Sequence, residues 1–259
     1  MSNFSNLYAR SYDLLYADKD YALEVNYISD LIKEFAPRST EILNLGCGTG
    51  SHDFLLAKEG YKILGIDQSE SMILRAQELA GLSKFSANVS FSLGDIRKLK
   101  LDRKFDVVLS LFHVMSYQIN NEDLENVFQT AKEHLNPGGV FIFDCWYGPG
   151  VLTDPPQVRI KRLEDKNIKL FRIAEPKQHV TQNIIDVNYE LHISSKENNE
   201  SEIVRETHRM RYIFDTEINW LSLNSSFKKI AGYEWMTRNE PSLKSWNTVY
   251  VCRLNNRTI

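Results

Sequence analysis

An apolar, strand-like segment at residues 42–45 runs directly into three glycines, Gly46, Gly48 and Gly50, and a helix-like segment follows over residues 51–59. Glycine has no Cβ, so it permits a tight turn and lets a ligand lie directly against backbone amides. A strand, a glycine turn and a helix in this order predict a pocket for a nucleotide or a nucleoside. This turn constrains the fold of the chain more than any other feature.

Around the turn, short apolar segments alternate with helical ones. Continuously apolar strands separated by helices indicate a parallel sheet that is covered by helices on both faces. A Pro-Gly-Gly sequence, residues 137–139, is expected to turn the chain into the fifth strand. The strands are expected at 42–45, 62–66, 89–93, 105–110 and 140–144, and the helices at 51–59, at 69–80 with Ser69 as its cap, and at 122–135.

The pattern changes after residue 146, where β-type segments replace the alternation. They are expected at 158–163, 170–174, 184–193 and 203–212, followed by a helix at 216–225 and strands at 227–235 and 247–254. The chain is therefore predicted to have three parts. These are an N-terminal helical lid over 1–36, a core over 37–150 and 215–259, and an antiparallel β insertion over 151–214.

Composition excludes several classes of function. The 259 residues carry a formal net charge of −3, so no global field attracts the chain to nucleic acid or to an anionic membrane. No apolar run approaches the roughly 20 residues that a membrane span needs, and the N-terminal residues lack the pattern of a secretory signal. The three cysteines, Cys47, Cys145 and Cys252, lie far apart without a CxxC pair. This predicts no metal site, no disulfide framework and a cytoplasmic protein, with Cys47 packed into the fold.

The residues after the turn narrow the ligand. A dinucleotide fingerprint requires glycine at the sixth position of the turn, where this chain has Ser51, and no GxxxxGK[ST] run occurs. Asp67 follows the second strand, where a carboxylate can accept hydrogen bonds from both ribose hydroxyls. Asp95 follows the third strand and can take the amino group of adenine, with Ile96 packed on the ring. The pattern predicts an adenosine-type ligand.

Four segments in succession carry a resemblance. The turn at 44–50, Asp67, the pair Gly94-Asp95 and the segment 135–139 resemble the signatures of class I S-adenosylmethionine-dependent methyltransferases. The resemblance implies S-adenosylmethionine as the cofactor, and a doubly wound, mostly parallel, seven-stranded Rossmann-like α/β sheet. The chain departs from that family at Asn44, where Asp or Glu is usual. An amide can still form hydrogen bonds there, but it carries no charge.

Further segments are similar to bacterial N,N-dimethyltransferases that act on nucleotide-linked amino sugars. They lie at 12–21, 144–149, 206–209 and 241–242. The resemblance implies an acceptor site formed by Tyr12, Trp146, Tyr147, His208 and Arg209. The implied cofactor contacts are Tyr16, Tyr21, Asn44, Gly46, Gly48, Gly50, Asp67, Gln68, Asp95, Ile96 and Leu111.

Methyl transfer needs few catalytic side chains. A sulfonium methyl group is already activated, so the reaction depends mainly on positioning the acceptor, and an amine must also lose a proton. By the resemblance Tyr117 faces the methyl group, and His113 is a second candidate base. His208 and Arg209 are neighbours on a strand and cannot face the same side. A solvated strand face and a site for an acceptor phosphate are equal alternatives for this segment.

The sequence thus predicts a methyltransferase with a small-molecule acceptor, most plausibly an amino sugar carried on a nucleotide. O-methylation of a sugar or of another metabolite shares every cofactor residue and is the alternative among enzymes. A non-catalytic S-adenosylmethionine-binding protein is the alternative outside enzymes. Nucleic acid and membranes are not expected partners, and the assembly state is open, with a homodimer one alternative.

Overall fold

The structure, a computed structural model, describes residues 14–15, 19–198 and 200–255. Tyr12 and Tyr16 lie outside the described residues, so their predicted roles are carried forward only as predictions. The contacts divide the chain into two compact units. The larger unit comprises Tyr21–Asp154 and the chain from Tyr212 onward, and the smaller one comprises Pro155–Arg211 with the described residues ahead of Tyr21.

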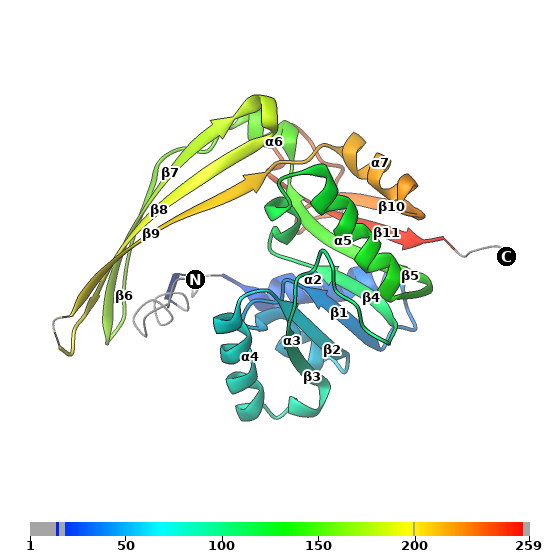
Figure 1. Ribbon diagram of the computed structural model, residues 1–259, viewed down its shortest axis with the longest axis horizontal. Helices are drawn as coiled ribbons and strands as arrows, with labels where there is room; N and C mark the ends of the chain where they lie inside the picture. Colours follow the sequence, from blue (N-terminus) through cyan, green and yellow to red (C-terminus); the bar gives the residue numbers. More distant parts are fainter. Residues whose placement is uncertain (1–13, 16–18, 199, 256–259) are drawn as a thin grey trace. The chain divides into compact units, whose positions relative to one another are not determined.

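The larger unit is built on a seven-stranded sheet in the order β10-β11-β5-β4-β1-β2-β3 (Figure 1). All pairings from β3 to β5 are parallel, whereas β11 runs antiparallel to both β5 and β10. This confirms the predicted mostly parallel sheet. The strands are β1 (Glu41–Leu45), β2 (Lys62–Asp67), β3 (Val89–Leu93), β4 (Phe105–Ser110), β5 (Leu135–Trp146), β10 (Phe227–Glu234) and β11 (Asn247–Leu254).

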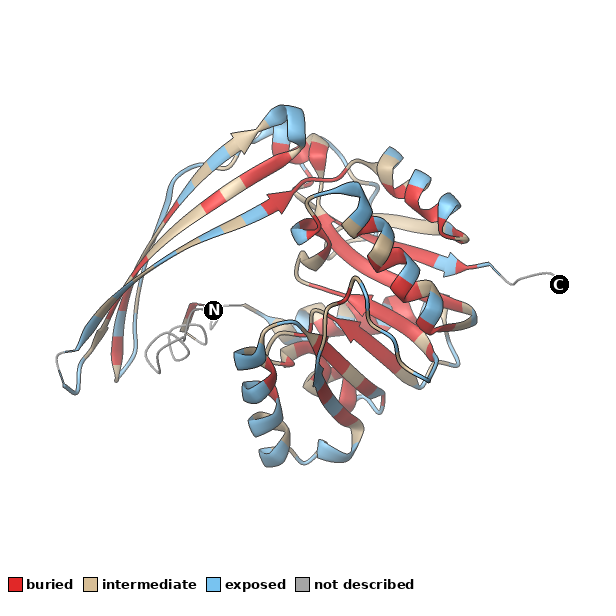
Figure 2. Ribbon diagram, in the orientation of Figure 1, coloured by how far each residue is buried: buried red, intermediate tan, exposed pale blue. Residues whose placement is uncertain are grey.

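Helices cover both faces of this sheet. Successive strand residues point to opposite sides, so continuously apolar strands present apolar side chains on both faces. Along β1, Leu43 and Leu45 join one apolar cluster and Ile42 joins the other. The first cluster includes residues of α5 (Asn121–His134) and α7 (Asp215–Asn224). The second includes residues of α2 (Tyr21–Phe35), α3 (Ser51–Lys58) and α4 (Glu70–Leu82). Figure 2 shows the resulting pattern, with buried central strands and a largely exposed outer face on α4.

The strand order reverses beside β1. From β1 the chain proceeds through β2 to β3 on one side, and it then returns to place β4 and β5 on the other side. Ligands of open α/β sheets bind at the carboxyl ends of the strands that flank such a reversal. Here those ends are the Gly46–Gly50 turn after β1 and the segment from Leu111 to Tyr117 after β4. The fold therefore brings these two segments to one edge of the sheet.

One local prediction for the larger unit was wrong, and three short helices were not predicted. Residues 137–139 do not form a turn ahead of the fifth strand but lie inside β5, where the register with β4 shifts between Phe105 and Val107. The extra residues of β5 form an irregularity in its pairing with β4. Gly138, with a φ of 77°, permits this backbone conformation. The sequence also does not predict α6 (Gly148–Thr153), because two glycines and a proline suggest a loop. The 3₁₀ segments η1 (Ser86–Asn88) and η2 (Val114–Tyr117) are likewise absent from the prediction.

The smaller unit is a four-stranded antiparallel sheet in the order β6-β7-β8-β9. Three of its strands, β7, β8 and β9, are longer than predicted because their alternating residues keep the pairing through the polar ends, whereas β6 has the predicted length. One face buries Leu170, Leu191 and Ile193 against Leu15. The strands are β6 (Arg159–Glu164), β7 (Ile168–His179), β8 (Ile184–Ser195) and β9 (Ser201–Arg211), with η3 (Val180–Gln182) between β7 and β8.

The predicted lid boundary at residue 36 does not match these units. Helix α2 belongs to the larger unit because Ile28, Leu31 and Ile32 are buried in the same cluster as Ile42. The lid role of the segment before Tyr21 stays a prediction. Within the described part of the chain, no helix is both long enough and apolar enough to cross a membrane. The same residues contain no group of three or more His, Cys, Asp or Glu side chains placed to hold a metal ion.

Candidate active site

The glycine turn has the backbone geometry that its sequence predicts. Gly46, Gly48 and Gly50 have φ values of 83°, 56° and 81°, in the left-handed region that favours glycine. A Cβ at Gly48 would meet no atom of the described residues within 4 Å, whereas one at Gly50 would lie 2.4 Å from the Phe91 ring. Gly50 is therefore required by packing. Gly48 is the position where the backbone borders open space among the described residues, as a ligand lying against the turn requires.

Asp67 holds the turn from the end of the neighbouring strand. Its Oδ2 accepts a hydrogen bond from the Gly48 N–H at 2.9 Å, and its Oδ1 accepts one from the Ser69 N–H at 2.9 Å. Burial raises the pKa of this carboxyl, and these backbone hydrogen bonds oppose that effect. An ionised carboxylate has about four acceptor positions, so it retains capacity for two hydroxyl donors. The geometry fits the predicted ribose contact.

Asn44 is engaged by an acidic residue that the sequence reasoning missed. The Asn44 side chain is 2% exposed and donates from Nδ2 to Oδ2 of Asp53 at 2.9 Å. Asp53 lies in the first turn of α3 and is fully buried, and burial raises its pKa to about 7 despite the hydrogen bond from Asn44. The Oδ1 atoms of both side chains are buried without a described partner. An acidic side chain, supplied by residue 53, thus lies directly beside Asn44.

Asp53→Asn is expected to make the free energy of unfolding less dependent on pH. The pKa of Asp53 is raised in the folded state, so between about pH 4 and pH 7 the native chain binds a proton that the unfolded chain releases. Stability therefore falls as the pH rises through this window. The amide does not titrate, so the variant lacks this pH-dependent loss. We expect the free energy of unfolding of the variant, relative to that of the parent, to rise by a few kcal/mol from pH 4 to pH 8. Urea titrations at both pH values measure this, and an equal difference at both would contradict it.

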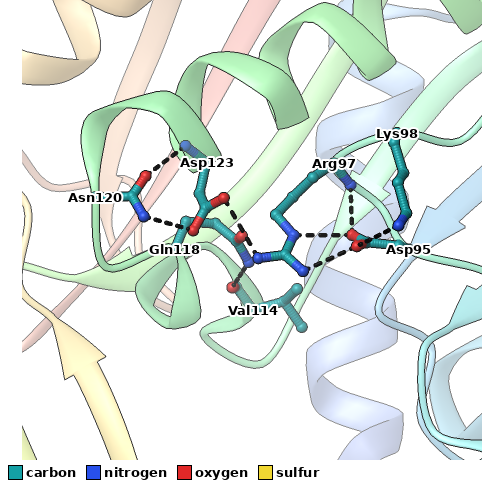
Figure 3. Close-up of polar contacts among 7 residues, drawn as sticks. All are labelled: Asp95, Arg97, Lys98, Val114, Gln118, Asn120 and Asp123. Atoms are coloured by element: carbon teal, nitrogen blue, oxygen red, sulfur yellow. Dashed lines mark hydrogen bonds and ion pairs between the residues drawn. The ribbon is translucent and has the colours of Figure 1, made fainter.

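Asp95 is held by an arginine. Its carboxylate accepts hydrogen bonds from Nε and Nη2 of Arg97 at 2.9 and 2.8 Å, and Arg97 also contacts Asp123 at 3.3 Å (Figure 3). The hydrogen bond from Arg97 lowers the pKa of Asp95. The network ties the segment after β3 to the first turn of α5, whose cap, Asn120, accepts from the Asp123 N–H. Asp95 therefore stays ionised at neutral pH, with part of its acceptor capacity already used.

Other predicted cofactor contacts lie around the turn. Ile96 and Leu111 are 8% and 2% exposed and pack in opposite apolar clusters. Gln68 is exposed after β2. Tyr21, at the start of α2, packs edge-on against the ring of His52 in α3, with the ring centres 5.1 Å apart. The structure thus connects Tyr21 to the helix that follows the turn.

The segment after β4 brings His113 to a buried carboxylate. Phe112 and His113 both adopt the left-handed region, with φ values of 67° and 63°. Nδ1 of His113 lies 2.6 Å from Oδ2 of Asp144 at the end of β5. The neighbouring Val114 packs on the glycine turn, because its methyl groups lie 2.6 Å from where a Cβ of Gly46 would be. His113 is therefore one residue from a direct contact with the turn.

The predicted aromatic residues follow on the same edge. The ring of Trp146 lies 6.4 Å from the His113 ring and 5.2 Å from the ring of Trp246. Tyr147 is partly buried, and burial raises its pKa. Tyr117, the last residue of η2, is 45% exposed. The structure thus groups His113 with Trp146.

His208 and Arg209 belong to the smaller unit and face opposite sides of its sheet. In the β8–β9 register His208 pairs with Val187 and Arg209 with Asp186. The His208 ring packs edge-on against Tyr189, with the centres 5.0 Å apart. Arg209 lies 3.2 Å from a carboxylate oxygen of Asp186 on the other face. The expectation that the two residues diverge is met, and their roles in acceptor binding stay predictions.

The cysteines are free thiols in the buried core. Burial raises the pKa of Cys47 well above its usual range, with the nearby carboxyl groups of Asp53 and Asp67 adding to the effect. A thiolate is the nucleophilic form of cysteine, so Cys47 is poorly suited to that role. It packs in the cluster with Phe91, as the sequence interpretation expects.

The segment that carries this geometry resembles known proteins. Residues 42–139, which include the turn, Asp67, Asp95 and His113, match a family model described as a methyltransferase domain. This part of the chain is similar to methyltransferase domains. The matched segment runs from β1 to the start of β5 and includes the glycine turn after β1 and the segment after β4.

Relatives extend the likeness beyond the methyltransferase domain. A dTDP-3-amino-3,4,6-trideoxy-alpha-D-glucopyranose N,N-dimethyltransferase of Streptomyces venezuelae is 34% identical over 149 residues, covering 57% of this chain and 60% of that protein. A dTDP-4-amino-2,3,4,6-tetradeoxy-D-glucose N,N-dimethyltransferase of Saccharopolyspora spinosa is 30% identical over 155 residues, covering 59% and 60%. The matched segment thus spans about three fifths of these relatives.

The whole fold is shared with a solved structure. An S-adenosylmethionine-dependent methyltransferase from Clostridium acetobutylicum superposes with a TM-score of 0.79 at 20% identity, covering 96% of this chain and 98% of that chain. This likeness includes both units of the described chain. At that identity it establishes the fold and not the acceptor.

Proposed function

We propose that this protein is an S-adenosylmethionine-dependent methyltransferase that methylates the amino group of a nucleotide-linked sugar. The observation that carries the proposal is the glycine turn clamped by Asp67, whose carboxylate accepts the Gly48 N–H at 2.9 Å. The turn supplies backbone amides, and Asp67 supplies an acceptor for ribose hydroxyls. The two similar sugar N,N-dimethyltransferases support the acceptor class.

The residues around the turn fit S-adenosylmethionine. Gly48 borders open space, and the buried Oδ1 of Asn44 is an acceptor without a described partner. Asp95 and Ile96 would hold the adenine, and Tyr21 would help to cover the cofactor. When bound, the cofactor supplies a methyl group that is activated for displacement by its sulfonium. The protein's task is then to orient the acceptor, exclude water and remove a proton from the amine.

The acceptor class is tested with radiolabelled S-adenosylmethionine and pairs of nucleotide sugars. Each pair differs only in carrying an amino or a hydroxyl group at one ring carbon. We expect label on the amino member and little on its hydroxyl partner. Label on the hydroxyl members alone would instead establish O-methylation. Cofactor binding without label on any acceptor would favour a non-catalytic binding protein.

The proposal includes a cytoplasmic location, supported by three buried cysteines that remain free thiols. For the assembly state, a homodimer is one alternative, which light scattering on the purified protein measures directly. Neither point affects the assignment of the cofactor site.

A further inference from the structure

The segment after β4 holds a strained backbone at His113. Phe112 and His113 are consecutive non-glycine residues in the left-handed region, with φ values of 67° and 63°. Such conformations are strained for residues with a side chain, and they persist only where the surroundings enforce them. The contacts that enforce this one come from Asp144.

Asp144 contacts His113 twice. Its carboxylate accepts a hydrogen bond from the His113 backbone N–H at 3.1 Å, and its Oδ2 lies 2.6 Å from Nδ1 of the His113 ring. The Asp144 side chain is completely buried, whereas that of His113 is 20% exposed. One buried carboxylate therefore sets both the backbone and the ring of a histidine that reaches the surface.

Nδ1 of His113 lies 2.6 Å from Oδ2 of Asp144, but it is buried and has no hydrogen-bond partner among the described residues. A lone pair on Nδ1 would face the negative charge of an ionised Asp144, so electrostatics favour hydrogen on Nδ1 and leave the lone pair of the ring on Nε2. The pair thus has the chemistry of an oriented general base.

We propose that His113 is the base that deprotonates the acceptor amine and that Asp144 is its positioning residue. This inference rests on the proposed function and selects between the two candidate bases, His113 and Tyr117. Tyr117 lies at the end of η2 and is 45% exposed. Imidazole is also the side chain whose ordinary titration lies nearest to neutral pH, which suits a base.

The proposed step balances as follows. The protonated acceptor amine gives one proton to Nε2 of His113, and the freed lone pair forms the new N–C bond with the methyl carbon. The S–C bond breaks, and its electron pair stays on sulfur, which becomes the neutral thioether. The imidazolium then releases its proton to solvent, and the ring returns to the form with hydrogen on Nδ1.

His113→Asn is the direct test. Asparagine tolerates the left-handed backbone, so the fold of the segment is kept while the base is removed. We expect turnover to fall about 100-fold or more, with S-adenosylmethionine affinity within about twofold of the parent, and added imidazole to restore part of the rate. The matched control is His192→Asn, because His192 also lies 2.6 Å from a carboxylate, that of Glu190, but belongs to the smaller unit. It should retain the parental rate.

Asp144→Asn tests the positioning role. The amide keeps the shape and an acceptor for the backbone N–H, but it removes the charge. We expect ¹⁵N spectra of the imidazole to show hydrogen on Nδ1 in the parent and a mixture of both tautomers in the variant. The turnover number should fall about 10- to 100-fold, with a smaller change in KM. Parental tautomers and turnover in Asp144→Asn would overturn the role of Asp144.

The proposed function and the assignment of His113 as the base are tested by different outcomes. If the parent methylates an amine and His113→Asn is equally active, the base assignment is overturned and the proposed function stands. A large loss in Tyr117→Phe with none in His113→Asn would assign the base to Tyr117. If the parent methylates no amine, the proposed function fails, whereas the ¹⁵N spectra still report whether Asp144 fixes the His113 ring.

Discussion

Replacing Asp67 with alanine is expected to weaken S-adenosylmethionine binding by about 100-fold or more. The carboxylate accepts the Gly48 N–H at 2.9 Å, so the variant loses both the ribose acceptor and the clamp on the turn. Each hydrogen bond to a charged group contributes about 1.5–3 kcal/mol, and loss of two accounts for an effect of this size. Isothermal titration calorimetry on the folded variant measures the affinity directly.

Asp106 offers a matched control for this substitution. It is also a carboxylate that accepts two backbone hydrogen bonds, from the N–H groups of Thr40 and Glu41 at 2.9 and 3.1 Å. It lies near the start of β4, at the opposite end of the sheet from the glycine turn. Asp106→Ala should therefore lose some stability but keep its cofactor affinity. Equal losses of affinity in the two variants would contradict the assignment of Asp67.

A single methyl group at Gly150 is expected to lower the free energy of unfolding by about 3 kcal/mol or more. A Cβ there would lie 2.0 Å from the backbone carbonyl oxygen of Ser245 and 3.2 Å from the backbone nitrogen of Trp246. Both neighbours are main-chain atoms, so a side-chain rotation cannot relieve the overlap, and the backbone must move. Urea unfolding followed by circular dichroism measures the loss.

Gly81→Ala is the control with the opposite expected sign. Gly81 lies in helix α4, and a Cβ there would meet no atom within 4 Å. Alanine in a helix is favoured over glycine by up to about 1 kcal/mol, so this variant should be slightly more stable than the parent. If both substitutions destabilise the chain to a similar extent, the close approach of Ser245 to Gly150 is not the cause.

The strands of the larger unit were predictable because their residues are almost continuously apolar and end at glycine or aspartate. β3 and β4 match their predicted bounds, and β1 and β2 differ by one residue. Ser69 was predictable as the cap of α4 from its residue type and position, and it accepts from the Met72 N–H. Helix α6 was not predictable, because its glycines and proline signal a loop. Glycine suits this helix only because Gly150 packs closely on Ser245.

For the site, the spacing of Gly46, Gly48, Gly50 and Asp67 was informative because each residue acts at a strand end that the pattern already locates. The partners of these residues were less accessible. Asp53 stands nine residues beyond Asn44, in the first turn of the next helix. Arg97, two residues after Asp95, was a local signal that the prediction passed over. Asp144 meets His113 only because β4 and β5 pair, a relation that follows from the fold and not from sequence spacing.

The placement of β11 has a consequence for biosynthesis. Strand β5, which carries Asp144, pairs on one side with β4 and on the other with β11, a strand made more than a hundred residues later. Until Asn247–Leu254 leaves the ribosome, one edge of β5 has no partner strand. Such an edge is a template for pairing with other chains. The nascent protein therefore passes through an aggregation-prone stage at the strand that supports its proposed proton acceptor, and chaperone binding is most useful in that interval.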